Sequence, residues 1–129
     1  MDTRIIVDTT IWIEFFRNPQ SSHSSHLKDL LRQQRVVMVG MVLAEILQGI
    51  KAPKEAQLVL TGFTKLPYSE MTKDRWQQAG EISASLRKKG TTLPLSDLTI
   101  ASCALAEGCE VYTLDPHFKR IPGVKIYLP

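Results

Sequence analysis

The sequence lacks any long hydrophobic run. No window of its 129 residues approaches the roughly 18 apolar residues that a membrane-spanning helix needs, and the N-terminus has no signal-peptide pattern. Internal repeats, low-complexity tracts and linkers are also missing. We therefore expect one cytoplasmic domain over residues 1–129, with a single core and no membrane contact.

Cysteine is scarce, because Cys103 and Cys109 are the only two in the chain. Their spacing matches no metal-ligand motif, and no second pair exists that could complete a zinc site. A disulfide would be unusual in a reducing compartment. We expect two reduced thiols, with Cys103 packing as a small apolar residue.

Neither sign of charge dominates, since 16 Lys and Arg face 13 Asp and Glu, giving a net charge of +3. If some acids are gathered in one pocket, the remaining surface is basic and suits a polyanion held by its backbone. The run Arg87, Lys88 and Lys89 at a predicted helix end is a candidate for steering phosphates. The alternative is a solvated run that complements the helix dipole.

Short apolar runs alternate with amphipathic segments along the whole chain. Strands are predicted at residues 4–7, 36–39, 63–66, 110–114 and 124–128. Helices are predicted at residues 11–16, 27–34, 41–50, 53–61, 72–89 and 97–106. Ser96 is the expected N-cap of the last helix, and Trp12 and Trp76 are expected in the core. The alternation predicts an α/β fold, a three-layer sandwich around a central, mostly parallel sheet.

Four carboxylates lie where local structure does not explain a charge. Asp8 and Asp115 follow predicted strands, Glu45 lies inside an apolar helix, and Asp97 opens a helix. Burying an unpaired carboxylate costs several kcal/mol or forces it to hold a proton. Ligands of open α/β sheets bind beyond the carboxyl ends of the strands. We therefore expect the four acids to converge on one site.

Such a cluster requires a cation, because two carboxylates about 4 Å apart repel by about 4 kcal/mol at an effective dielectric of about 20. Oxygen donors favour Mg²⁺ or Mn²⁺ over zinc. A metal site of this kind can bind a phosphodiester and activate a water. Taken alone, Asp8 is compatible with a strand end, Asp97 with a helix cap and Asp115 with a turn. Their joint occurrence favours the metal site.

Four segments of the chain resemble the PIN-domain family, and within it the VapC-type toxin ribonucleases. The segments are VDTTIWI at residues 7–13, AEIL at 44–47, DLTIA at 97–101 and TLDPHF at 113–118. Each is short and weakly specific, whereas all four in this order and spacing make the resemblance strong over the full chain.

The resemblance implies a metal-dependent endoribonuclease that is the toxin of a toxin–antitoxin pair. A water activated by one or two Mg²⁺ or Mn²⁺ ions would attack the RNA, leaving a 5′-phosphate and a 3′-hydroxyl. By this likeness, the metal-binding and catalytic residues are Asp8, Glu45, Asp97 and Asp115, supported by the hydroxyls of Thr10 and Thr113. The implied partners are an RNA substrate, a VapB-like antitoxin that covers the cleft, and a second copy in a homodimer.

One position departs from the family pattern. Many relatives have an acid directly before Phe118, where this chain has His117, so Asp115 is the only acid of this motif. We expect His117 to be a turn residue after Pro116, with contact to substrate as the alternative.

Two other functions are compatible with the sequence. A phosphatase of the aspartyl-phosphate type would use Asp8, but Thr10 occupies the place of the second acid that this chemistry needs. A non-catalytic binding module would keep the fold without the reaction, and the intact set of four acids argues against it.

Overall fold

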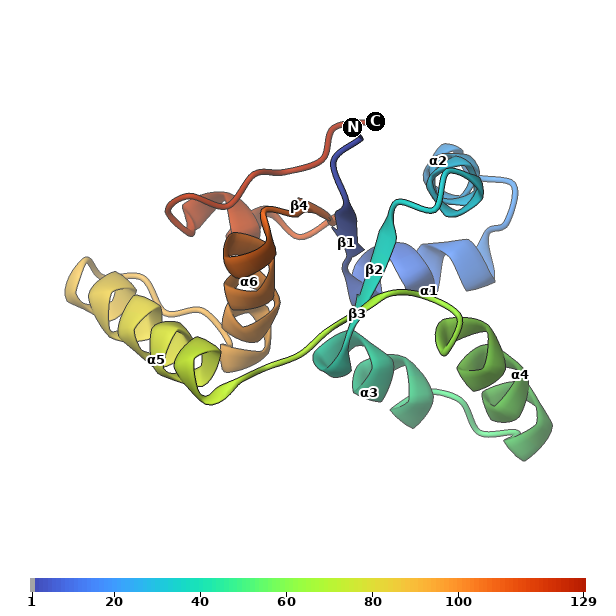
Figure 1. Ribbon diagram of the computed structural model, residues 1–129, viewed down its shortest axis with the longest axis horizontal. Coiled ribbons are helices and arrows are strands. Elements are labelled where there is room, and N and C mark those ends of the chain that lie inside the picture. The colour runs from blue at the N-terminus through green and yellow to red at the C-terminus, as the bar shows by residue number, and fades with distance from the viewer. Residues whose placement is uncertain (1) are drawn as a thin grey trace.

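The computed structural model describes residues 2–129 and has one parallel sheet at its centre (Figure 1). Its strands lie in the order β3-β2-β1-β4. They are β1 (Ile5–Val7), β2 (Val36–Val39), β3 (Tyr68–Ser69) and β4 (Glu110–Tyr112). All three pairings are parallel. The residues of β1 and β2 are all buried because helices cover both faces of the sheet, which explains the continuous apolar runs.

Six α-helices and one 3₁₀-helix surround the sheet in the described part of the chain. They are α1 (Thr9–Arg17), α2 (Ser22–Arg32), α3 (Gly40–Gln48), α4 (Pro53–Phe63), α5 (Lys73–Lys88), α6 (Leu95–Glu107) and η1 (Pro116–Arg120). In Figure 1, α5 and α6 lie on one side of the sheet, whereas α1, α2 and α4 lie on the other. The predicted α/β sandwich with a parallel sheet is therefore confirmed.

Two predicted strands are wrong. Phe63 ends α4 instead of opening a strand, because its ring completes the apolar face of that helix and lies 4.9 Å from the ring of Trp12. The edge strand is β3, which begins after Pro67. Residues 124–128 form no strand either, and contribute only an isolated parallel bridge between Ile126 and Val111.

The predicted starts of two helices also differ from the structure. Pro94 is the N-cap of α6, and Ser96 lies inside the first turn, where its carbonyl accepts a hydrogen bond from Thr99 Oγ1. Helix α2 begins at Ser22, five residues before the predicted start at Leu27. Its cap is Ser21, whose hydroxyl accepts the Ser24 backbone N–H, so the serine-rich segment is helical.

The two tryptophans behave differently. Trp12 is 3% exposed and belongs to the core, as predicted, whereas Trp76 is 54% exposed on α5. Trp76 lies three residues before Ala79, at the edge of the predicted apolar face of α5, whose positions Ala79 and Leu86 are buried. Among residues 2–129, no helix combines the length and the apolar character needed to cross a membrane.

Gly108 joins α6 to β4 and gives the first prediction. It adopts a left-handed conformation with φ +67°, and a Cβ there would meet no atom within 4 Å. Gly108→Ala should therefore lower the free energy of unfolding by about 1 kcal/mol through backbone strain alone. The measurement is urea unfolding followed by circular dichroism.

The matched control is Gly80→Ala in the interior of α5, where a Cβ also meets nothing within 4 Å. Alanine is the better helix former, so this variant should gain about 0.5–1 kcal/mol. Equal effects of the two substitutions would contradict the conformational argument.

Candidate metal centre

Asp8 lies at the carboxyl end of β1 and is 5% exposed. Its Oδ2 accepts hydrogen bonds from Thr10 Oγ1 at 2.9 Å and from Thr113 Oγ1 at 2.7 Å. Its backbone N–H donates to the carbonyl of Tyr112 at 2.9 Å, which continues the pairing of β1 with β4. These bonds place the carboxylate at the edge of the sheet and leave Oδ1 as the oxygen available to a cation.

The loop after β4 is built around the same two hydroxyls. Thr10 Oγ1 accepts the backbone N–H of Leu114 at 3.1 Å, and Thr113 Oγ1 accepts that of Asp115 at 2.9 Å. The Asp115 side chain caps η1 by accepting the backbone N–H of His117 at 2.9 Å. Thr10 and Thr113 thus connect Asp8 to the segment that carries Asp115, in line with their predicted supporting role.

Glu45 is held by a residue that the sequence analysis did not select. Thr9 Oγ1, in the first turn of α1, donates to Glu45 Oε1 at 2.7 Å. Helix α3 packs against α1 and keeps Glu45 half-buried. The signal in the sequence was that Asp8 is followed by two hydroxyl residues, Thr9 and Thr10, of which the sequence analysis selected only Thr10.

Asp97 lies in the first turn of α6 and is the acid whose pKa is most clearly displaced. Burial raises its pKa to about 6, and the charges of Asp115, Asp8 and Glu45 add to the rise, while His117 opposes it. The other three predicted acids therefore lie near enough to Asp97 for their charges to act on it. Their negative charges are concentrated at one point of the carboxyl edge of the sheet.

A divalent cation fits this donor set. Asp97, Asp115 and His117 each offer one donor atom, and the three atoms lie within 4.8 Å of one another. Asp8 and Glu45 are not members of this triplet, and one carboxylate oxygen of each accepts a hydrogen bond from a threonine hydroxyl. The chemistry of these donors, mainly carboxylate oxygens, suits Mg²⁺ or Mn²⁺.

The basic run Arg87, Lys88 and Lys89 is exposed at the C-terminal end of α5. In Figure 1, this end of α5 lies at the outside of the molecule, and the following segment returns to the start of α6. From this place the three side chains can act on a polyanion through their long-range field. Their role in steering RNA stays a prediction.

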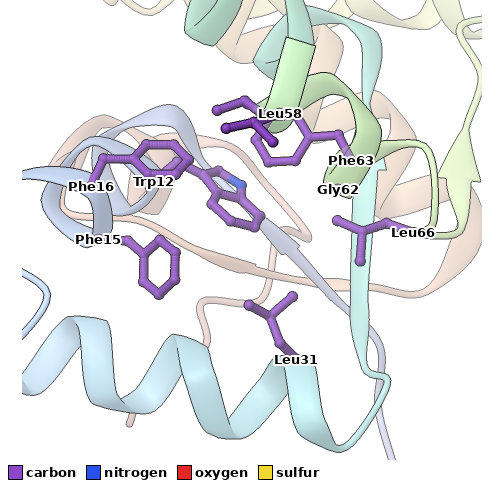
Figure 2. A pocket seen from close by; sticks show the side chains of 9 residues that line it. Trp12, Phe15, Phe16, Leu31, Leu58, Gly62, Phe63 and Leu66 are labelled. Carbon is purple, nitrogen blue, oxygen red and sulfur yellow. The ribbon is translucent and has the colours of Figure 1, made fainter. Parts of the chain in front are cut away.

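An apolar pocket of about 310 Å³ lies between α1, α2 and α4 (Figure 2). Figure 2 shows Trp12 between Phe16 and Phe63, and the ring centroids of Trp12 and Phe16 are 6.1 Å apart. Phe16 and Val59 also line a second groove, which includes Glu45. The aromatic pocket therefore adjoins the groove that includes Glu45, one of the four acids.

An acidic site at the carboxyl edge of a parallel sheet defines an α/β protein suited to divalent cations and phosphate groups. Residues 5–124 match the PIN domain, and the chain belongs to the PIN domain family. This confirms the resemblance that the four sequence motifs indicated.

Three similar proteins cover nearly the whole chain. Ribonuclease VapC2 of Rickettsia felis is 28% identical over 124 residues, 92% of each chain. The tRNA(fMet)-specific endonuclease VapC of Salmonella typhimurium is 28% identical over 130 residues, 95% of this chain and 96% of that one. The crystal structure of DNA-bound VapBC from Salmonella typhimurium includes a chain with a TM-score of 0.81 and 27% identity, covering 98% of both chains.

The displaced pKa of Asp97 predicts how stability depends on pH. Its value of about 6 in the folded protein exceeds the ordinary 3.8, so folding disfavours the charged form and stability falls as the pH rises from 3.8 to about 6. In EDTA above about pH 6, Asp97→Asn should therefore raise the free energy of unfolding by about 1–2 kcal/mol, allowing for solvent screening. Below pH 3.8 the gain should vanish.

Urea unfolding across this pH range measures the effect. The control is Glu81→Gln, an exposed acid within α5, which should stay within about 0.5 kcal/mol of the wild type throughout. An Asp97→Asn gain that is the same at every pH would contradict the electrostatic origin.

Proposed function

We propose that the protein is a Mg²⁺- or Mn²⁺-dependent endoribonuclease and the toxin of a toxin–antitoxin pair. The observation that carries this proposal is geometric: donor atoms of Asp97, Asp115 and His117 lie within 4.8 Å of one another, and the Thr113 hydroxyl links Asp8 to the backbone of Asp115. The raised pKa of Asp97, to which the charges of Asp115, Asp8 and Glu45 contribute, supports a shared site for the four acids. Membership of the PIN domain family and the names of the relatives, which are a ribonuclease and a tRNA endonuclease, support RNA as the substrate.

The four acids would hold the metal, each from a different element. A divalent ion held there would lower the pKa of a bound water and would neutralise negative charge at the phosphate, and hydrolysis of this kind would leave a 5′-phosphate and a 3′-hydroxyl. Thr10 and Thr113 fix the orientation of Asp8, and Thr9 fixes that of Glu45. Such preorganised side chains need little rearrangement when the substrate binds.

The structure gives the phosphatase alternative no support. That reaction needs an acid at position 10, whereas the Thr10 hydroxyl donates to Asp8 and accepts from the backbone of Leu114. The non-catalytic binding module is the alternative that the following experiment distinguishes.

Purified protein freed of any partner should cleave structured RNA with Mg²⁺ or Mn²⁺, and EDTA should stop the reaction. Asp8→Asn and Asp97→Asn should each lower the rate at least about a hundredfold, because both remove a charged ligand. The control is Asp29→Asn, whose carboxylate forms an exposed surface ion pair with Arg32 and should leave the rate unchanged.

Cleavage of labelled RNA pools, followed by analysis of the product ends, measures these rates. Wild-type rates in both site variants would show that the proposed site is wrong. Inactivity of the wild type on every pool would favour the binding module instead.

The proposed partner is a VapB-like antitoxin, because solved structures similar to this chain are VapBC complexes. The aromatic pocket supports a docking role. Phe16 and Leu58 are 44% and 75% exposed at its rim, although large apolar side chains are usually buried. Trp12 Nε1 is buried and lacks a hydrogen-bond acceptor within residues 2–129. A carbonyl of a bound peptide would satisfy it. The family likeness also supports a homodimer, which stays a prediction.

A charge in this pocket should weaken binding of the antitoxin. Leu58→Lys should raise the dissociation constant for the protein encoded beside it at least about tenfold, because the exposed leucine would be buried in the complex. Trp76→Lys is the matched control, since Trp76 is 54% exposed on α5, which lies on the other side of the sheet from the pocket (Figure 1).

Calorimetry measures the affinity, and co-expression tests its consequence in cells. Growth arrest by the wild type should be relieved by the neighbouring gene, and relief should fail for Leu58→Lys. Equal affinities of the two lysine variants would exclude the pocket as the docking site.

A further inference from the structure

His117 faces the acidic site instead of turning away from it. Its Nδ1 lies 3.1 Å from Asp115 Oδ1, and its side chain offers a donor atom within 4.8 Å of those of Asp97 and Asp115. Its backbone N–H also donates to Asp115, which fixes the first turn of η1 around this carboxylate. His117 is therefore more than a turn residue after Pro116.

The spacing of these donors is compatible with one bound ion. Ligands of Mg²⁺ or Mn²⁺ lie about 2.1 Å from the metal, so neighbouring ligands of an octahedral ion are about 3.0 Å apart and opposite ones about 4.2 Å. The 3.1 Å separation of His117 from Asp115 corresponds to neighbouring ligands. All three donor atoms lie within 4.8 Å of one another, so small side-chain movements would bring them to one ion.

We propose that His117 is a nitrogen ligand of the divalent ion, together with Asp97 and Asp115. The inference rests on the metal site of the proposed function and assigns it a ligand outside the four acids. An imidazole is a softer donor than a carboxylate and suits transition metals, whereas Mg²⁺ prefers oxygen. His117 should therefore shift the preference of the site from Mg²⁺ toward Mn²⁺.

An ion pair between His117 and Asp115 is the competing explanation of the same distance. In that arrangement Nδ1 carries a proton directed at Asp115 Oδ1, and the imidazole does not coordinate the metal. A ligand must instead present a lone pair to the ion. The two arrangements differ in whether a nitrogen nucleus is bonded to the metal, which can be measured without following the reaction.

The experiment is electron spin-echo spectroscopy of the untagged full chain loaded with Mn²⁺. The wild type should show the ¹⁴N modulation of a coordinated imidazole, and His117→Asn should lose it while keeping a native circular dichroism spectrum. His117→Asp should bind Mn²⁺ without this modulation. Its ratio of Mn²⁺ to Mg²⁺ affinity should be at least about threefold lower than that of the wild type.

The chain offers a matched control, because it contains only three histidines. His26→Asn on α2 should keep the modulation. His23 lines a groove that also includes Asp115, and its Nδ1 lies 2.7 Å from the Tyr112 hydroxyl. Modulation that survives in His117→Asn would assign the nitrogen to another residue and overturn the proposal.

Failure of this inference differs from failure of the proposed function. A wild type that binds Mn²⁺ without ¹⁴N modulation excludes His117 as a ligand but leaves the metal-dependent nuclease intact. A wild type that binds no Mn²⁺ in an EPR titration would contradict the proposed metal site, and with it the proposal that His117 is a ligand.

Discussion

The buried carboxylate of Asp8 is the constraint on which the rest of the site depends. Two hydroxyls, from Thr10 and Thr113, donate to one of its oxygens and join the end of β1, the first turn of α1 and the loop after β4. Because a buried carboxylate without partners costs several kcal/mol, these bonds are needed for folding as well as for orientation. The same two hydroxyl oxygens also accept hydrogen bonds from backbone N–H groups of the loop that carries Asp115. One carboxylate thus organises three segments that are distant in sequence.

Hydrogen bonds position the acids but do not cancel their repulsion. The pKa of Asp97 is raised by its burial and by the charges of Asp115, Asp8 and Glu45, so the site without a cation holds its negative charge at a cost to stability. A divalent ion would reverse this balance, since the same charges that repel one another attract the ion. Affinity for a metal and a stability penalty in its absence are two consequences of the same arrangement.

The parts of the site that follow from topology were predictable from the sequence. Asp8 and Asp115 each follow a short apolar strand, and parallel strands end at one edge of a sheet. The bond from Thr9 to Glu45 was not predictable, because it spans 36 residues and depends on how α3 packs against α1. Trp76 shows a related limit. Helical spacing correctly indicates the buried side of α5, which includes Ala79 and Leu86, but the neighbouring elements determine whether a residue at the edge of that side is covered.

Helix α1 contributes residues to both the acidic site and the aromatic pocket. Its first turn carries Thr9 and Thr10, which hold acids of the site, and its next turns carry Trp12 and Phe16, which line the aromatic pocket. Phe16 also lines the groove that includes Glu45, so the pocket and this groove share a wall. A peptide bound in the pocket would therefore lie beside Glu45, and it could not displace α1 without disturbing the hydrogen bonds of Thr9 and Thr10 to Glu45 and Asp8. Helix α1 is thus the element through which occupation of the pocket would act on the acidic site.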